Sequence, residues 1–585
     1  MVKMNPIYEE AINWEFEECT FEEGLDKIVA YGEFSGYCPT YVERIPPCTN
    51  ACPAGEDIRG YNNLVREGVW DAEDPYAAAF ARLTQKNPFP AVMGRVCPAP
   101  CQGACNRQYR DETIGINSVE HAIGQYAIEK GLGFEKPEVA STGKHIAVVG
   151  GGVGGLSAAY QLTLRGHKVT IYERDPKLGG MLRYGILGYR VSREVIDAEV
   201  KRIIDLGVEV KHGVTIGKDV TLDELREKHD AVFLAVGAQR GRNIPIPGAD
   251  APNVTTAIDF LRDFEINGGI EAGGADKVKV GKNVVVIGDG DVAMDACRLA
   301  LRLGSKATLL SGVSREEMNC SDFEYDEAIA EGTDMKMMTG TVEIQGGASG
   351  VTGIKVVEMV RKDKGEDGWN HAVPFFRYKT KEGTEAVIEC DMVVAAIGQT
   401  TDMNGLESCT EGSPFLQVDH NYQIKGMDNV FGGGDAVQIH LLTTAIGHGR
   451  KAAESIDLFL KGEKLPSKPS RPDVVAYDKL KSDFFVEKPQ PKRKVHHPAN
   501  VVGDWKETLE ALSNEVASDE AGRCMSCGMC FECNQCMLFC PQDAITKFKG
   551  NPEGEVMFTY YERCVGCHIC SEVCPTGYID MGMGI

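Results

Sequence analysis

The chain has 585 residues, 43% of them hydrophobic, and a formal net charge of −24 at pH 7. This length predicts three or more domains, and the negative charge argues against binding to nucleic acid or to an anionic membrane. No apolar run approaches the roughly 18 residues that a bilayer span needs. The acidic start, MVKMNPIYEE, lacks the apolar core of a signal peptide. We therefore expect a cytoplasmic protein without a membrane span.

The 21 cysteines are concentrated near the two ends of the chain. Seven precede residue 106, and ten lie between Cys524 and Cys574. Clustering at metal-ligand spacing in a chain without a leader favours metal binding over disulfides.

The first cysteine cluster has two parts, Cys48-x3-Cys52-Pro and Cys97-x3-Cys101-x3-Cys105, separated by a helical pattern over residues 58–84. Thiolates one helical turn apart can converge on one metal centre. The spacings match neither a zinc finger nor a simple ferredoxin. Spacing alone therefore leaves open both an iron–sulfur domain and a helical domain with reduced cysteines.

A dinucleotide-binding pattern follows. Residues 145–149 are an apolar run typical of a buried parallel strand, and a helical pattern covers 156–164. Between them, Gly150, Gly152 and Gly155 form G-x-G-x-x-G, which provides a tight turn, a close approach to a pyrophosphate and close helix–strand packing. A second strand, 167–172, ends in Glu173, where a carboxylate would hold a ribose hydroxyl. An ordinary glycine turn is the alternative, but strand, helix, strand and acid in register favour a dinucleotide.

The same pattern recurs later in the chain. Residues 282–287 are a second apolar strand, a helix is predicted over 294–303, and a further strand covers 306–310. The turn between strand and helix has the form G-x-G-x-x-A, with Gly288, Gly290, Asp291 and Ala293. A second nucleotide fold inserted into the first is typical of two-dinucleotide oxidoreductases, so this one is expected to bind nicotinamide.

The C-terminal cysteines have the two-cluster bacterial ferredoxin pattern, in which the fourth cysteine of each run serves the other cluster. This pattern predicts two [4Fe–4S] clusters, one held by Cys530, Cys533, Cys536 and Cys574, the other by Cys564, Cys567, Cys570 and Cys540. Zinc would not explain the x3-Cys-Pro ending of both runs. Cys524 and Cys527 fit neither quartet and have no assigned role.

A Pro- and Lys-rich stretch, 461–505, predicts a tether or a surface strap, and a short helix is expected over 505–516.

The segment CPAPCQGAC followed by the G-x-G-x-x-G resembles the glutamate synthase small-subunit family. The resemblance implies two [4Fe–4S] clusters in a helical N-terminal domain. Cys52, Cys97, Cys101 and Glu120 would hold one, although spacing alone would make Glu120 a solvated helix residue. Cys48 and Cys105 would hold the other. The family has two closely spaced cysteines before Cys48, and this chain has only Cys38 there, so one ligand of that cluster is missing. The N-terminal domain is thus expected to carry one or two clusters.

The same resemblance implies positions around FAD and nicotinamide. Beside FAD it places Gly180, Met181, Arg190, Gly434, Asp435 (to the ribityl chain), Thr443 and Thr444. The return strand at the nicotinamide cleft carries Ala396 and Gly398. Where NADPH-using members have Tyr-Arg-Arg, this chain has Ser311, Gly312 and Val313, which removes the arginines that grip a 2′-phosphate. Arg315 remains nearby, so NADH is favoured while NADP(H) stays open.

These expectations give a multidomain fold: a helical iron–sulfur domain, two α/β Rossmann-like domains, one inserted in the other, and an α+β two-cluster ferredoxin domain. The expected bounds are 1–143, FAD-binding 144–250 and 385–460, NAD(P)-binding 251–384, linker 461–515 and ferredoxin-like 516–585.

The domain order resembles the DsrL family of dissimilatory sulfur metabolism, which implies electron transfer between NAD(H), FAD, clusters and dissimilatory sulfite reductase, with a homodimer possible. No general acid or base is required, and no catalytic residue is assigned. One alternative is a glutamate synthase small-subunit-like NADPH oxidoreductase serving ferredoxin or another reductase. The other is a non-enzymatic iron–sulfur assembly or sensor module.

Overall fold

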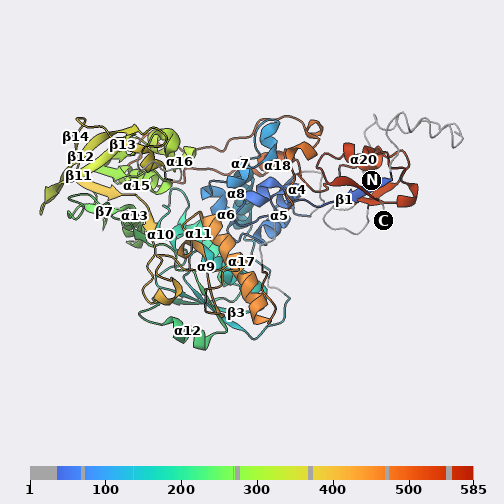
Figure 1. Cartoon of the computed structure of the whole chain (residues 1–585), viewed down its shortest axis with the longest axis horizontal. Coiled ribbons are helices and arrows are strands. Elements are labelled where there is room, and N and C mark those ends of the chain that lie inside the picture. Colours follow the sequence, from blue (N-terminus) through green and yellow to red (C-terminus); the bar gives the residue numbers. More distant parts are fainter. Residues whose placement is uncertain are drawn as a thin grey trace.

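The computed structural model describes residues 36–66, 73–135, 138–267, 269, 277–366, 373–467, 473–547 and 557–583. The predicted domain start at residues 1–35, with Cys19, lies outside these ranges. A central helical domain separates the two nucleotide-binding units from the ferredoxin-like domain (Figure 1). Among the helices of the described ranges, none has both the length and the apolar composition of a membrane span.

The central domain is built from short capped helices. Asp57 and Asp74 cap two of them by accepting hydrogen bonds from the backbone N–H groups of Gly60 and Ala77, and prolines occupy the first turns of several others. Gly124 allows one pair to pack closely, because a Cβ there would lie 2.2 Å from the backbone N of Ala91. The helices are α3 (Pro47–Ala51), α4 (Ile58–Val65), α5 (Pro75–Thr84), α6 (Pro90–Val96), α7 (Pro100–Gly103) and α8 (Ile116–Glu129).

The first nucleotide-binding unit is a parallel sheet in the order β17-β5-β2-β3-β4. Its apolar strands are buried because helices cover both faces of a parallel sheet. The strands are β2 (His145–Val149), β3 (Lys168–Glu173), β4 (Glu209–His212), β5 (Ala231–Leu234) and β17 (Val430–Gly432). The helices include α9 (Val153–Leu164), α10 (Met181–Tyr184), α11 (Arg193–Ile204), α12 (Leu222–Lys228) and α17 (Leu442–Leu460).

The second unit is inserted between β5 and β17 and has its own parallel sheet, in the order β10-β9-β8-β15-β7. These strands are β7 (Val254–Thr256), β8 (Asn283–Ile287), β9 (Lys306–Leu310), β10 (Asp334–Lys336) and β15 (Met392–Ala395), with helices α13 (Ala257–Ile266), α15 (Asp291–Arg302) and α16 (Asp322–Ala330). An antiparallel sheet follows, of β11 (Thr339–Gly347), β12 (Gly350–Arg361), β13 (Tyr378–Thr380) and β14 (Ala386–Glu389).

The structure corrects the expected return point between these units. β14 pairs with β12, and β15 pairs with β7 and β8, so the residues directly after 385 still belong to the insertion. The short strands β6 (Arg240–Gly241) and β16 (Gln399–Thr400) pair with each other at the crossing between the units.

The stretch after α17 is an extended strap over the central domain, as its composition predicts. Its backbone folds back on itself, from His496 N to Thr508 O (2.7 Å), and pairs with the first nucleotide-binding unit, from Thr508 N to Tyr189 O (2.8 Å). Because these long-range bonds take the backbone groups that a helix needs, the helix predicted over 505–516 is wrong. It begins later, as α18 (Asn514–Gly522), where the Ser513 side chain accepts from Val516 N.

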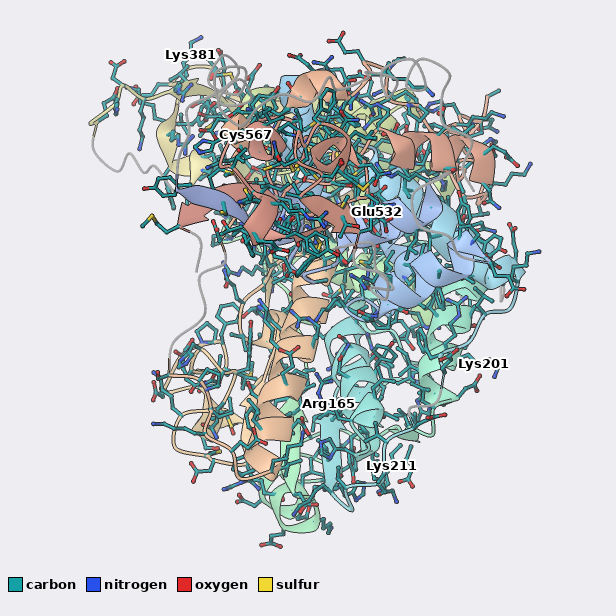
Figure 2. The ribbon with its side chains drawn as sticks, turned by 90° about the vertical axis from the view of Figure 1, so that its right-hand side faces the viewer. Arg165, Lys201, Lys211, Lys381, Glu532 and Cys567 are labelled. Carbon is teal, nitrogen blue, oxygen red and sulfur yellow. The ribbon has the colours of Figure 1, made fainter. Side chains whose placement is uncertain are left out.

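The ferredoxin-like domain contains α19 (Gln535–Leu538), β18 (Ile545–Lys547), β19 (Met557–Thr559), α20 (Ile569–Glu572) and β20 (Ile579–Met583). It also contains β1 (Tyr37–Tyr41), which pairs antiparallel with β20 and sets Cys38 opposite Gly582. The expectation that the first 143 residues form one helical domain is therefore wrong for this strand. Figure 2 views the molecule from this end, where Glu532 and Cys567 lie. Lys211, in β4 of the first nucleotide-binding unit, is near the bottom of that view.

Candidate functional site

A cavity of about 290 Å³ lies at the carboxyl ends of the first parallel sheet. β2 ends at Val149, and Gly150 takes φ = 103°. A Cβ on Gly150 would lie 2.3 Å from the Ala235 carbonyl oxygen, and one on Gly155 only 1.9 Å from the Gly150 carbonyl oxygen. Only glycine therefore fits this turn, and α9 begins directly after Gly152 with its positive N-terminus at the cavity.

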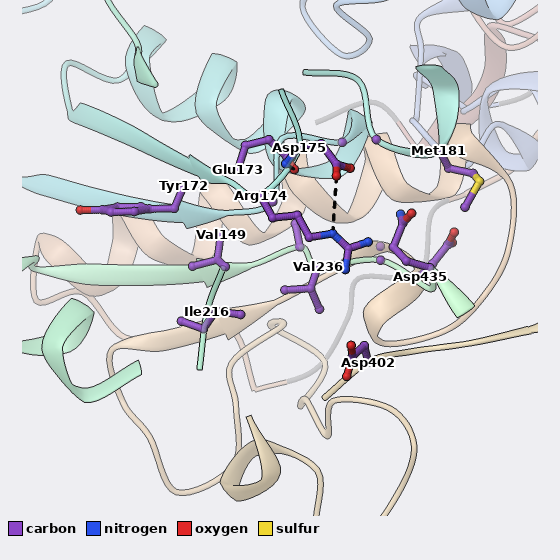
Figure 3. Close-up of a pocket in the computed structure, with 18 of the residues that line it drawn as sticks. Val149, Tyr172, Glu173, Arg174, Asp175, Met181, Ile216, Val236, Asp402 and Asp435 are labelled. Carbon is purple, nitrogen blue, oxygen red and sulfur yellow. Dashed lines mark hydrogen bonds and ion pairs between the residues drawn. The ribbon is translucent and has the colours of Figure 1, made fainter. Parts of the chain in front are cut away.

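Glu173 lines the cavity from the end of β3. Its two carboxylate oxygens accept the backbone N–H groups of Gly151 (2.7 Å) and Asp175 (2.8 Å), and burial raises its pKa. The carboxylate therefore links the glycine loop to the turn after β3. The neighbouring Arg174 extends across the cavity toward Asp175 (Figure 3), with 3.8 Å between Nε and Oδ1. Sequence reasoning missed Arg174; its place directly after Glu173 was the available signal.

The cavity is also lined by Gly180, Met181, Gly434 and Asp435. Burial raises the pKa of Asp435 to about 6. Gln239, also missed, lines the cavity, and its Oε1 is buried without a hydrogen-bond partner among the described residues. A ligand hydroxyl would satisfy that acceptor, so the residues present fit a dinucleotide such as FAD.

Two predicted flavin residues point elsewhere. Thr443, in the first turn of α17, lies beside the thiol of Cys97, with 3.9 Å between Oγ1 and Sγ. The Thr444 hydroxyl is 3.2 Å from Nδ1 of His440. In the same turn, Leu442 and Ala445 line the cavity. The start of α17 therefore contacts the cavity on one side and a cysteine on the other.

The structure also places Arg190 away from the cavity wall. Its guanidinium donates to Asp295 (2.7 Å) and Glu324 (2.5 Å), both buried in the inserted unit. Arg190 therefore forms ion pairs that join the two nucleotide-binding units, and the expectation that it lies beside the flavin is wrong.

The predicted nicotinamide residues meet at the ends of β8 and β15. A Cβ on Gly288 would lie 2.4 Å from the Ala396 carbonyl oxygen, whereas Gly290 has open space around it. Ala293 is buried in α15, and Gly398 has φ = 105°. Asp291 accepts the backbone N–H of Ser321 (2.9 Å), so this carboxylate holds the loop after β9.

Arg315 is held by its own neighbours. It forms an ion pair with Asp322, and its guanidinium lies 4.0 Å from the ring centroid of Tyr325. Phe375 lies over Gly312, where a Cβ would meet the ring edge at 2.7 Å. Val313 is buried.

The ferredoxin-like cysteines line two cavities. Cys530, Cys533, Cys536 and Cys574 line one, and Cys540, Cys564, Cys567 and Cys570 line the other. The fold thus brings together the two interleaved quartets that the spacing predicts. In the described part of the chain, no group of three or more His, Cys, Asp or Glu side chains is arranged to hold a single metal ion.

Cys52, Cys97 and Cys101 face one another in the central domain, together with Glu120. Burial and the nearby carboxylates of Glu120 and Glu56 raise the pKa of Cys97 to about 12. Burial, with the same two carboxylates, also raises the pKa of Cys52. Asn87 donates to both Glu56 (2.9 Å) and Glu120 (3.1 Å). Glu56 was missed by sequence reasoning, since a lone acid after Cys-Pro gives no spacing signal.

This group also fits a cluster. The Tyr61 hydroxyl is buried without a hydrogen-bond partner among the described residues, close to Cys52, Cys101 and the two carboxylates. Burial is the main cause of its raised pKa, so the hydroxyl stays protonated and is a free donor. Cluster sulfur atoms accept such hydrogen bonds.

The remaining predicted ligands separate. Cys48 and Cys105 line a further cavity of the central domain. Cys38 is in β1, in the ferredoxin-like domain, where its side chain contacts Cys564. Cys38 is therefore not near Cys48, and its expected place in an N-terminal cluster is wrong. Its pairing with β20, more than 500 residues later, takes it away.

Three family models match the chain. The model of pyridine nucleotide-disulphide oxidoreductases matches residues 144–449, that of the 4Fe–4S domain II of dihydropyrimidine dehydrogenase matches 38–132, and a 4Fe–4S dicluster domain matches 520–581. They coincide with the two nucleotide-binding units, the central domain and the ferredoxin-like domain.

Among curated proteins, the chain is 31% identical over 517 residues to the NADP(+)-dependent formate dehydrogenase subunit beta of Moorella thermoacetica, covering 82% of this chain and 70% of that protein. It is 31% identical over 532 residues to the NADPH-Fe(3+) oxidoreductase subunit beta of Geobacter sulfurreducens, covering 82% and 75%. It is 33% identical over 437 residues to the small chain of glutamate synthase [NADPH] of Azospirillum brasilense, covering 72% and 87%. The chain therefore belongs to the glutamate synthase small-subunit-like family of iron–sulfur flavoprotein oxidoreductases, which transfer electrons.

Proposed function

We propose that this chain transfers electrons from NADH through FAD and [4Fe–4S] clusters to a separate redox protein. The observation that carries the proposal is the packing of α17. Its first turn lines the flavin cavity through Leu442 and Ala445, and its Thr443 hydroxyl lies 3.9 Å from the Cys97 thiol. Further along, a Cβ on Gly447 would lie 2.1 Å from the carbonyl oxygen of Pro53, the residue after Cys52. One helix therefore joins the flavin cavity to two proposed cluster ligands.

When bound, FAD supplies a hydride acceptor that releases electrons one at a time, and the clusters supply one-electron carriers. The residues of this chain bind and orient these groups. The glycine turn and the N-terminus of α9 face the place of a pyrophosphate, and Asp435 lines the same cavity. No residue is assigned to proton transfer, because hydride and electron transfer between cofactors require none from the protein.

The preference for NADH is supported by the surroundings of Arg315. A 2′-phosphate is usually recognised by an arginine with free donors. Here Arg315 is already paired with Asp322 and stacked on Tyr325, and the two residues that are arginines in NADPH-using members are Gly312 and Val313. The loop after β9 therefore offers an NADPH phosphate little positive charge.

A second candidate is an NADP(H)-dependent oxidoreductase serving a different reductase. The relatives named above favour it, because the formate dehydrogenase, iron(III) oxidoreductase and glutamate synthase chains all carry NADP(+) or NADPH in their names. Breaking the exposed Arg315–Asp322 pair costs little energy, which would let Arg315 turn toward a 2′-phosphate.

For the partner, we propose dissimilatory sulfite reductase, on the strength of the domain order with its C-terminal ferredoxin-like domain. The relatives named above concern formate, iron(III) and glutamate instead. The ferredoxin-like domain lies at the end of the molecule opposite the nucleotide-binding units (Figure 1), which suits delivery of electrons to a second protein. Co-purification with a sirohaem protein supports this partner, and co-purification with a glutamate synthase large subunit contradicts it.

The decisive experiment is anaerobic steady-state reduction of a viologen dye, with NADH and NADPH compared on protein whose flavin and iron have been counted. We expect turnover by protein that carries both FAD and [4Fe–4S] clusters, and a higher kcat/KM with NADH than with NADPH. Higher kcat/KM with NADPH supports the second candidate. No turnover by fully loaded protein contradicts an oxidoreductase and supports the assembly or sensor alternative.

A further inference from the structure

We infer that Cys524 and Cys527 complete an iron–sulfur site with Cys48 and Cys105, so that the C-terminal segment supplies half the ligands of a [4Fe–4S] cluster in the central domain. All four cysteines line one cavity, whose other walls include Ile58, Ile114 and Ile116. All four are free thiols. Four thiolates around an apolar cavity are the usual ligand set of such a cluster.

The segment that carries Cys524 and Cys527 is fixed against α4. Arg66 Nη1 donates to the Cys524 carbonyl oxygen (3.1 Å), and Arg59 Nη1 donates to the Cys527 carbonyl oxygen (3.3 Å). Between the two cysteines, the Ser526 hydroxyl donates to Asn63 Oδ1 (2.8 Å) in the buried interior. The turn between these cysteines is therefore bound to the central domain at three successive points.

The other pair comes from the central domain itself. Cys48 lies in the first turn of α3, and Cys105 precedes the 3₁₀ turn Asn106–Tyr109. Asn106 Nδ2 lies 3.9 Å from the Cys527 sulfur, so the two pairs meet at the cavity.

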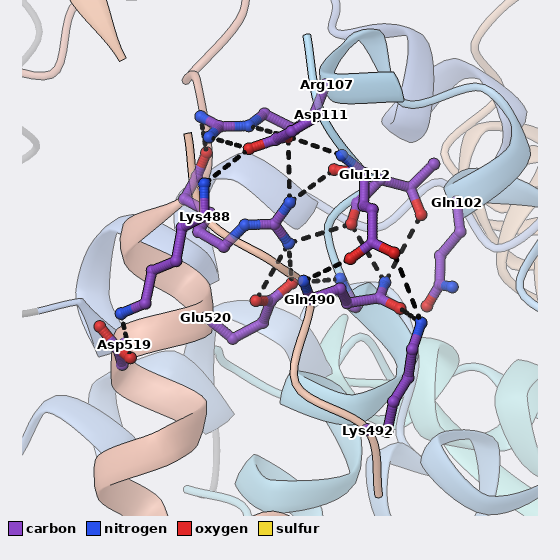
Figure 4. Close-up of polar contacts among 12 residues, drawn as sticks. Gln102, Arg107, Asp111, Glu112, Lys488, Gln490, Lys492, Asp519 and Glu520 are labelled. Atoms are coloured by element: carbon purple, nitrogen blue, oxygen red, sulfur yellow. Dashed lines mark hydrogen bonds and ion pairs between the residues drawn. The ribbon is translucent and has the colours of Figure 1, made fainter. Parts of the chain in front are cut away.

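A buried polar network holds α18, directly before Cys524, in this position (Figure 4). Arg107 forms a two-pronged pair with Asp111 (2.6 Å for each bond) and donates to the Arg523 carbonyl oxygen (3.0 Å). Arg523 in turn donates to Asp111 (3.1 Å) and to Glu520 (2.8 Å). Glu520 accepts the backbone N–H of Gly115 (2.6 Å). The residues after Cys105 and before Cys524 are thus locked together.

The charge around the cavity suits an anionic cluster. Arg59, Arg66, Arg107 and Arg523 are all less than one tenth exposed. Within the described residues, Nε of Arg59, Nε and Nη2 of Arg66, and Nε of Arg523 are buried without a hydrogen-bond partner. Asp111 and Glu520 already pair with Arg107 and Arg523. Buried guanidinium groups are costly unless compensated, and a cluster with four thiolate ligands carries the negative charge that compensates Arg59 and Arg66.

The position of the site extends the proposed electron route, and this step rests on the proposed function. Cys48 is one helical turn, about 6 Å, from Cys52 of the site beside α17. Cys527 precedes Cys530 of the ferredoxin-like domain by three residues, a span of at most about 11 Å. The inferred cluster therefore lies between the flavin side and the ferredoxin-like side of the molecule.

The test counts iron and zinc in the full-length, anaerobically purified protein. We expect about sixteen iron atoms, four [4Fe–4S] clusters, per chain. Cys524→Ser, Cys527→Ser and Cys48→Ser should each remove about four iron atoms and one Mössbauer component, with flavin content unchanged. The double variant Cys48→Ser/Cys524→Ser should lose no more than either single variant, because both residues hold one cluster. Cys409→Ser, at a buried cysteine in the first nucleotide-binding unit, should keep the full iron content.

Unchanged iron in Cys524→Ser and Cys527→Ser, additive losses in the double variant, or loss of zinc in place of iron would overturn the inference. If the variants do not fold, native mass spectrometry of the unaltered chain decides instead, since three clusters contradict the inference and four support it. Dye reduction by NADH in the unaltered chain tests the proposed function separately. Iron can therefore follow the expectation when turnover does not, and the two failures are distinguishable.

Discussion

Arg107 is the residue whose replacement tests the lock between the central domain and the C-terminal segment. Its side chain is 1% exposed. It makes both bonds to Asp111, one to the Arg523 carbonyl oxygen and one to the Val486 carbonyl oxygen (2.5 Å). Arg107→Ala removes all four bonds. They join the 3₁₀ turn Asn106–Tyr109 and the residues after it to the strap and to the segment before Cys524.

The size of the effect follows from these contacts. Breaking a buried ion pair by removing one partner costs about 3–5 kcal/mol. Asp111 keeps Arg523 and the backbone N–H groups of Lys488 and Glu112 (3.0 and 2.7 Å), so the low end, about 3 kcal/mol, applies. That energy corresponds to roughly a 100-fold larger population of the open form of the strap and the 523–528 segment.

Hydrogen exchange followed by mass spectrometry measures this opening locally, which matters because a multidomain chain does not unfold in two states. We expect exchange to rise by about 100-fold in peptides covering 486–490 and 523–528, and to stay unchanged in β2 and α9. Arg110→Ala is the matched control from the same turn. It removes one bond to the strap, to the Phe485 carbonyl oxygen (2.7 Å), and ion pairs with the exposed Asp483 and Glu487, which contribute about 0–1 kcal/mol each, so exchange should rise far less. Equal exchange in Arg107→Ala and Arg110→Ala would refute the reasoning.

Three further changes test the nucleotide-binding units. Gly155→Ala places a Cβ 1.9 Å from a backbone oxygen and should abolish bound flavin, measured by absorbance per chain, whereas Gly133→Ala, with open space around it, should not. Gly312→Arg displaces only the exposed edge of Phe375 and should raise the kcat/KM ratio of NADPH to NADH by about 10-fold or more, the value of one charge-assisted bond; an unchanged ratio contradicts that role for the loop. Arg190→Ala leaves Asp295 and Glu324 buried without this partner and should slow flavin reduction in stopped flow by about 10-fold or more with flavin retained; wild-type rates would show that the pair does not align the units.

The parts of the fold set by local patterns could be predicted from the sequence. The strands at His145–Val149 and Lys306–Leu310 are observed as expected, because short apolar runs beside glycine turns encode buried parallel strands. The interleaved quartets of the ferredoxin-like domain follow from spacing, because each run supplies three neighbouring cysteines to one cavity and its fourth cysteine to the other. The glycine at 155 is required by a contact with Gly150 only five residues away.

The errors arise where contacts join distant segments. Cys38 belongs to β1, whose partner strand lies at the other end of the chain, and no local pattern encodes that pairing. Arg190 follows the flavin motif in sequence but pairs with the inserted unit. The segment 505–513 has helical periodicity, yet Glu507 accepts from Arg95 (3.0 Å) and from the backbone of Ser192 (2.7 Å), and those contacts hold it extended. Cys524 and Cys527 had no assigned role for the same reason, because their neighbours are Cys48 and Cys105.

The contact between Arg107 and Arg523 also determines when the central domain can complete its folding during synthesis. The two residues are 416 positions apart, and a ribosome that adds about 5–20 residues per second needs roughly 20–80 s to pass from one to the other. During that interval the central helices have been synthesised, but the segment that covers them does not yet exist. Cys48 and Cys105 therefore have no contact with Cys524 and Cys527 until the ribosome has passed residue 527, so the cavity that these four cysteines line closes only after both nucleotide-binding units have been synthesised.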